Sequence, residues 1–81
     1  FNPETVINYT VGGNETQRVA LRIYDALGAE VATLVEDFQA PGNYSVKFNT
    51  KSAGSNLSSG VYLYELTINS TTITKKLIVN K

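Results

Sequence analysis

The chain has 81 residues, enough for one domain, and its seven Lys/Arg residues balance seven Asp/Glu residues. Zero net charge without any larger basic cluster argues against nucleic-acid binding, and the lack of a run of about 18 apolar residues argues against membrane insertion. Cys, His, Met and Trp are absent, which excludes disulfides, Cys/His zinc sites and histidine catalysis, so we expect neither an enzyme nor a metal or other cofactor.

The first two predicted strands are separated by a glycine-rich turn. β-branched and aromatic residues fill 5–10 and, after the turn, 17–24. In the second run apolar residues alternate with Ala20, Arg22 and Tyr24, which predicts one buried face and one wet face.

A tight turn and a third strand follow. Asp25 and Gly28 suit the first and fourth positions of a type I turn. Residues 26–36 contain enough Ala, Leu and Glu for a helix. However, Gly28 and β-branched residues at alternate positions favour a strand over 30–35.

The middle of the chain predicts a turn, a strand and a crossing. Pro41 and Gly42 suit a type II turn, and the fourth strand follows around Tyr44 and Phe48. Residues 50–60 are small and polar apart from Leu57, so we expect them to connect two sheets.

A hairpin is predicted at the C-terminal end, with strands over 61–68 and 71–79 joined by Asn69-Ser70. In its last strand Leu77 and Val79 point one way and Ile78 the other, which requires either a bulge or two covered faces. Together these elements predict an all-β, antiparallel sandwich of about seven strands. Its expected core is Val19, Leu21, Ile23, Tyr44, Val46, Phe48, Tyr62, Tyr64 and Leu66.

Five segments, in order, resemble type A C-terminal sorting domains of the type IX secretion system, also called Por secretion tails. They are Phe1–Tyr9, Ile23–Val31, Pro41–Tyr44, Leu57–Tyr64 and Thr74–Lys81. Each segment is a weak signal alone, whereas five in the correct order are specific. The motif positions matched are Asn2, Pro3, Tyr24, Asp25, Gly28, Gly42, Tyr44, Ser59, Gly60 and Tyr62.

The resemblance implies an immunoglobulin-like sandwich at the C-terminus of an exported protein. It also implies a cargo domain in cis on the N-terminal side, and recognition by the type IX translocon and its associated sorting peptidase. The expected location is the cell surface or the medium, reached through the periplasm. Because the chain starts at Phe1 without an initiator Met or a signal peptide, we interpret residues 1–81 as one domain of a longer protein.

Two other functions stay open at this stage. The immunoglobulin-like domain of the flagellar hook-capping protein resembles this sequence in its pattern of residues. A structural or adhesive spacer domain is therefore the main alternative. Position separates it from a sorting domain, which is expected to end its precursor. Tyr62 and Tyr64 share a sheet face and could stack on a sugar in a carbohydrate-binding module, although core packing is the more usual role.

Lys75, Lys76 and Lys81 are the basic concentration of the chain. Lysines on an edge strand block edge-to-edge pairing. The resemblance implies a second role for them, as part of the surface that the translocon recognises. The two interpretations are compatible.

The carboxylates offer a weaker hypothesis. Asp25, Glu30, Glu36 and Asp37 could bind calcium or act as a hydrolytic pair, but their spacing matches neither. Asp25 is better explained as the residue that accepts hydrogen bonds within its own turn.

Overall fold

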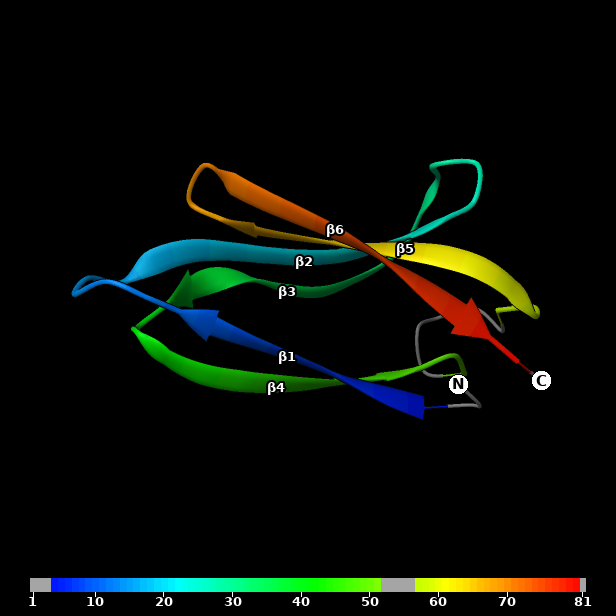
Figure 1. Ribbon diagram of the computed structural model, residues 1–81, viewed down its shortest axis with the longest axis horizontal. Coiled ribbons are helices and arrows are strands. Elements are labelled where there is room, and N and C mark those ends of the chain that lie inside the picture. The colour runs from blue at the N-terminus through cyan, green and yellow to red at the C-terminus, as the bar shows by residue number, and fades with distance from the viewer. Residues whose placement is uncertain (1–3, 52–56, 81) are drawn as a thin grey trace.

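The computed structural model describes residues 4–51 and 57–80, and the regular elements in these residues are strands. They form two antiparallel sheets that face each other (Figure 1). In the first sheet, β1 (Glu4–Val11) pairs with β4 (Gly42–Asn49). The second sheet has the order β3-β2-β5-β6, with β2 at Gln17–Asp25, β3 at Glu30–Gln39, β5 at Gly60–Ile68 and β6 at Thr71–Val79.

The predicted two-sheet, all-β architecture is confirmed, with one difference in the number of strands. The described residues hold six strands where about seven were expected. Each strand that the sequence predicts is present, and the crossing after β4 does carry the chain from one sheet to the other. Within the described ranges, no helix is long and apolar enough to cross a membrane.

β3 is a strand, as predicted, but it is longer than the sequence indicates and carries two bulges. Leu34 and Val31 are extra residues, since the pairing with β2 skips each of them. A bulge brings adjacent residues to the same side of a strand. Four neighbouring apolar residues of β3 therefore pack against the core, namely Val31, Ala32, Leu34 and Val35.

The core lies between the two sheets and is built from alternate residues of each strand. Of the nine predicted core residues, six are buried and three, Tyr44, Val46 and Tyr64, are half-buried against the cluster. The buried cluster also contains residues that the sequence analysis left out. These are Ile7, Tyr9, Val11, Leu57 and Val79.

The turns divide into those that the sequence predicts correctly and one that it does not. Asn69 has a φ of 55°, which suits the tight hairpin between β5 and β6. The predicted type II turn at Gly42 does not form, because its φ is 155° and not about +80°. A type II turn would lay the next strand against β3, whereas β4 pairs with β1 in the other sheet.

The two explanations offered for the last strand are both wrong. β6 pairs with β5 in unbroken register from Thr71 to Val79, so there is no bulge. Its outward face is not covered either, because Ile78 is 49% exposed beside Val61 on that face. Val79 is buried on the inward face and Leu77 is half-buried there.

Two tyrosines close the core at the end where β1 meets the start of β4. The rings of Tyr9 and Tyr44 stack with centroids 5.3 Å apart and an angle of 14° between their planes. The Tyr9 hydroxyl donates to Gln39 Oε1 at 2.5 Å, and the Tyr44 hydroxyl donates to the Ala40 carbonyl oxygen at 2.5 Å. These bonds satisfy the polar ends of two aromatic side chains that lie against the core.

Replacing Phe48 by Ala tests the assigned register of β4. Phe48 is 1% exposed, so we expect the free energy of unfolding to fall by about 3–5 kcal/mol. The control is Phe38→Ala. Phe38 is 63% exposed, so its replacement should lower the free energy of unfolding by less than about 1 kcal/mol. Urea unfolding of both variants measures the difference, and similar losses would contradict the register.

Alkaline pH is expected to destabilise the domain partly through Tyr9. Burial raises the pKa of the Tyr9 phenol above its ordinary value. The folded state therefore favours the neutral phenol, and this contribution is complete below about pH 10 and lost as pH rises through the folded-state pKa. Urea midpoints measured up to about pH 12 should fall less for Tyr9→Phe than for the unsubstituted chain. Parallel pH profiles would contradict this role.

Candidate recognition surface

Among the described strands β6 lies at one edge of the four-stranded sheet, and it presents two of the three lysines that the sequence singled out. Lys75 lies opposite Tyr64 of β5, and Lys76 lies opposite Leu63. Adjacent residues of a strand point to opposite faces, so the two lysines project from the two sides of the sheet. Both are exposed. Only a partner that approaches the edge of β6 can therefore contact both side chains at once.

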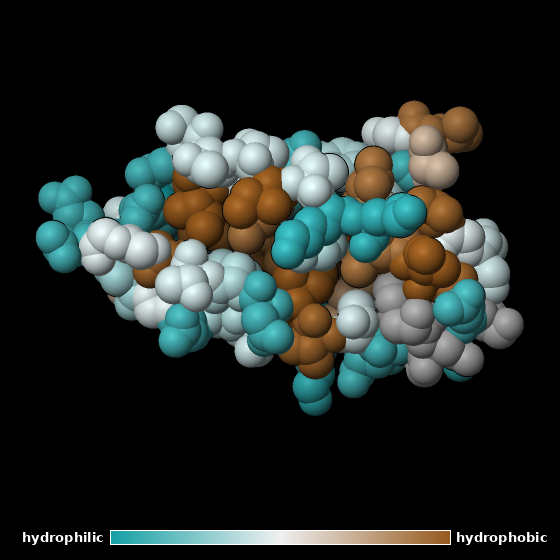
Figure 2. Space-filling model, viewed as in Figure 1, coloured by the Kyte–Doolittle hydropathy of each residue, from teal (hydrophilic) through white to brown (hydrophobic). Residues whose placement is uncertain are grey.

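The inward face of β6 is covered at one end only. Leu77 and Val79 reach the core, whereas Ile73 is 46% exposed and Lys75 is exposed on the same face. In the view with β6 in front, hydrophobic side chains remain visible on either side of a hydrophilic band (Figure 2). The edge thus combines positive charge with accessible apolar surface.

Asp25 and Gly28 form the turn that the sequence predicts. The Gly28 N–H donates to the Asp25 carbonyl at 3.0 Å, and Asp25 Oδ1 accepts from the backbone N–H groups of Leu27 and Ala29, each at 2.9 Å. Gly28 has a φ of 88°, which residues with a Cβ adopt at a cost. The role of Asp25 as a turn residue is confirmed, and this turn leaves Leu27 94% exposed at its tip.

The motif segments Ile23–Val31 and Leu57–Tyr64 meet at this end of the sheet. Asp25 of β2 pairs directly with Tyr62 of β5. The Tyr62 hydroxyl donates to the Ser58 carbonyl oxygen at 2.8 Å, and Tyr62 itself is buried. A shallow hollow of about 260 Å³ lies between the segments, lined by Asp25, Ala26, Leu27, Ser58, Ser59, Gly60, Val61 and Tyr62. Buried Tyr62 cannot serve as a sugar-stacking platform, so the core role of this tyrosine is confirmed.

The other predicted motif residues lie elsewhere. Gly42 and Tyr44 are at the opposite end of the molecule, where β4 begins opposite Val11. Tyr24 is half-buried on the outer face of β2, and burial, with a smaller contribution from Glu65, raises the pKa of its phenol. Asn2, Pro3 and Lys81 fall outside the described residues.

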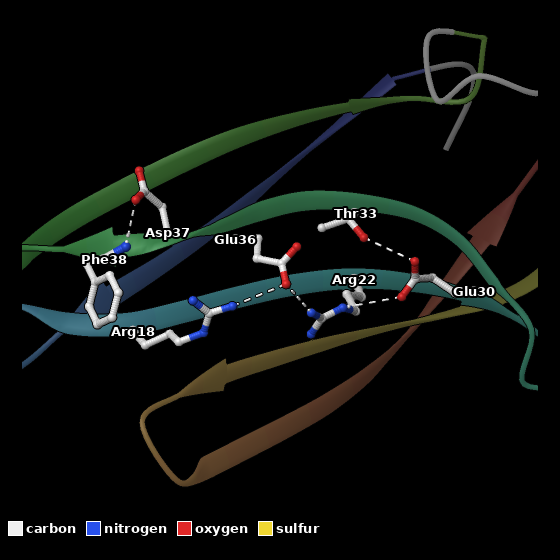
Figure 3. A network of polar contacts seen from close by, with 7 residues as sticks. All are labelled: Arg18, Arg22, Glu30, Thr33, Glu36, Asp37 and Phe38. Atoms are coloured by element: carbon white, nitrogen blue, oxygen red, sulfur yellow. Dashed lines mark hydrogen bonds and ion pairs between the residues drawn. The ribbon is translucent and has the colours of Figure 1, made fainter.

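The sequence analysis did not anticipate a polar network on the outer face of β2 and β3 (Figure 3). Glu36 Oε1 accepts from Arg22 at 2.8 Å and from Arg18 at 3.2 Å, and Arg22 Nε lies 3.3 Å from Glu30 Oε1. Arg18 also lies over the Phe38 ring, 5.8 Å from its centroid. Arg18 and Arg22 are four residues apart and therefore share a face of β2, but Glu36 was missed because the predicted strand ended at residue 35.

The network gives the carboxylates roles that the calcium and hydrolase hypotheses did not include. Glu30 and Glu36 pair with Arg22, and Asp37 Oδ1 accepts from the Phe38 N–H at 2.8 Å. Among the described residues, no group of three or more carboxylates is placed to hold a metal ion.

Comparison with known proteins decides the family. The family model described as the secretion system C-terminal sorting domain matches residues 2–80. The chain belongs to this family, the C-terminal sorting domains of type IX secretion. No curated protein and no solved structure gives a match.

In this sorting domain four of the described motif residues have identifiable structural roles. Asp25 and Gly28 build a turn, Tyr62 fills the core, and Tyr44 stacks on Tyr9. A motif made of such residues specifies the shape of the domain. Lys75 and Lys76, which are exposed on β6, are not among these motif positions.

Substitutions of Asp25 test whether this motif residue stabilises the fold. Asp25→Ala removes the acceptor of two hydrogen bonds and should lower the free energy of unfolding by about 1–2 kcal/mol. Asp25→Asn keeps an Oδ1 acceptor and should restore most of that loss. Thermal and urea unfolding of the two variants measure the effect, and equal destabilisation would contradict the turn role.

Proposed function

We propose that this sorting domain is the address that directs an attached cargo through the type IX translocon to the cell surface or the medium. The observation that carries the proposal is the family match over residues 2–80. The cargo is joined in cis on the N-terminal side and passes through the periplasm. The translocon and its associated sorting peptidase are the proposed partners.

The proposed recognition surface, which the translocon would contact, is the edge of β6. Lys75 and Lys76 are exposed on its opposite faces, and in the described part of the chain neither forms an ion pair. A strand held by nine consecutive pairings with β5 displays them in a fixed geometry. Rigid display lowers the entropy lost on binding, which favours recognition by a partner. We include Lys81 in this surface on the sequence pattern alone.

An immunoglobulin-like topology is part of the proposal. In that fold, strands C′, C, F and G form one sheet and strands B and E lie in the other. The order β3-β2-β5-β6 facing β1-β4 supports this correspondence, with β1 in the place of strand B. Such sandwiches present their edges and loops to partners while the core stays closed.

An export assay tests the function. A reporter with an export signal, followed by this domain, is expressed in a bacterium with a type IX system. The Lys75→Gln, Lys76→Gln double variant should lose export to the medium while its melting temperature stays unchanged, because both side chains are exposed. The matched control is Lys47→Gln, Lys51→Gln, which removes the same charge from two other exposed lysines and should be exported normally.

Two outcomes would contradict the proposal in different ways. If the unsubstituted domain leaves the reporter in the periplasm while native cargo is exported, the sorting function fails. The structural or adhesive spacer then takes its place. If both double variants are exported equally, the sorting function is retained and β6 is not the recognition surface.

A further inference from the structure

The two edges of the four-stranded sheet differ in how well they can accept another strand. β3 has two extra residues that interrupt its pairing, and bulges of this kind make an edge a poor template. β6 pairs with β5 over nine consecutive residues without a shift in register. From Thr71 to Leu77 this regular strand presents its outward backbone groups at the spacing that another strand requires.

β6 also differs from the strands of the other sheet in charge. Its sequence, TTITKKLIV, contains two lysines and no carboxylate. β1 carries no basic residue, and β4 carries Lys47 alone. The carboxylate nearest in register is Glu65 of β5, which lies opposite Thr74 and therefore diagonal to Lys76. The β6 edge is thus a regular edge with concentrated positive charge.

A second copy of this chain is a poor occupant of that edge. Lys75 is the central residue of β6, so symmetric antiparallel pairing of two β6 strands would set Lys75 against Lys75. Like charges directly opposite each other destabilise a strand pair. The same positions would instead favour a strand that carries carboxylates, because opposite charges at such positions stabilise pairing.

We propose that β6 accepts, by strand addition, an extended acidic segment of a partner protein. Adjacent carboxylates of that segment lie opposite Lys75 and Lys76, and an apolar residue lies opposite Ile73 on the same face as Lys75. Main-chain hydrogen bonds supply affinity and the side chains supply specificity, as in other cases of strand addition. The inference deepens the proposed function, and it rests on that function only in placing the partner within the secretion machinery.

The symmetric peptide Val-Thr-Glu-Glu-Thr-Val tests the inference, because it offers the required pattern in either strand direction. Acetylated and amidated, it is titrated into the full 81-residue chain and followed by amide NMR. We expect saturable shift changes and slower amide exchange confined to β6 and its neighbour β5. No binding up to millimolar peptide, or changes centred elsewhere, would overturn the proposal.

Two controls separate strand addition from simple charge attraction. The Lys75→Gln, Lys76→Gln variant should weaken binding about tenfold, whereas Lys47→Gln, Lys51→Gln should leave it unchanged. Peptides methylated on the backbone nitrogens of odd or of even residues form the second control. One of the two blocks the hydrogen bonds to β6 and should not bind. Equal binding of both, or equal loss in both lysine variants, overturns strand addition.

This binding assay does not depend on export. Peptide binding at β6 without export of the reporter would retain the strand-addition site and reject the sorting function. Export of the reporter without peptide binding would retain the sorting function and reject the strand-addition site.

Discussion

The structure depends on one imbalance, a two-stranded sheet packed against a four-stranded sheet. Burial of apolar side chains is the main favourable term in folding, and a domain of 81 residues has few such side chains available. β1 and β4 cover β2 and β5 well enough to bury Leu21, Ile23 and Phe48 almost completely. They do not cover all of β6, where burial declines from Val79 to Ile73. The exposed edge is thus a consequence of how the core is distributed.

The motif that identifies the family mainly maintains this shape. Asp25 accepts the hydrogen bonds of a tight turn and pairs with Tyr62, whose hydroxyl donates to the carbonyl oxygen of Ser58, two residues before β5 begins. Two segments separated by 25 residues in the sequence are held together at one end of the sheet in this way. Such contacts fix where the exposed groups of the domain stand.

In the proposed strand-addition site, Lys75 and Lys76 combine protection against self-pairing with selectivity for an acidic partner. Positive charge on a regular edge opposes pairing with a second copy, which is the common hazard of an uncovered strand. The same charge favours an acidic partner, so one feature supplies both the repulsive and the attractive element that specificity needs. The polar network of Arg18, Arg22 and Glu36 contrasts with this edge, because there the charges satisfy one another.

The sequence by itself determined the strands, most of the core and the turn at Asp25. Alternation of Val19, Leu21 and Ile23 reports burial directly, since side chains in a strand alternate between two faces. Glu36 could not be placed, because it lies beyond the predicted end of the third strand, and β3 extends to Gln39 through its pairing with β2. The turn at Gly42 was predicted wrongly for a related reason. The chain reverses there only if the next strand joins β3, whereas β4 joins β1 in the other sheet, and the sequence around Gly42 does not specify that choice. That Lys75 and Lys76 stand on an edge, on opposite faces, was likewise decided by tertiary structure, because strand order depends on contacts between residues far apart in the chain.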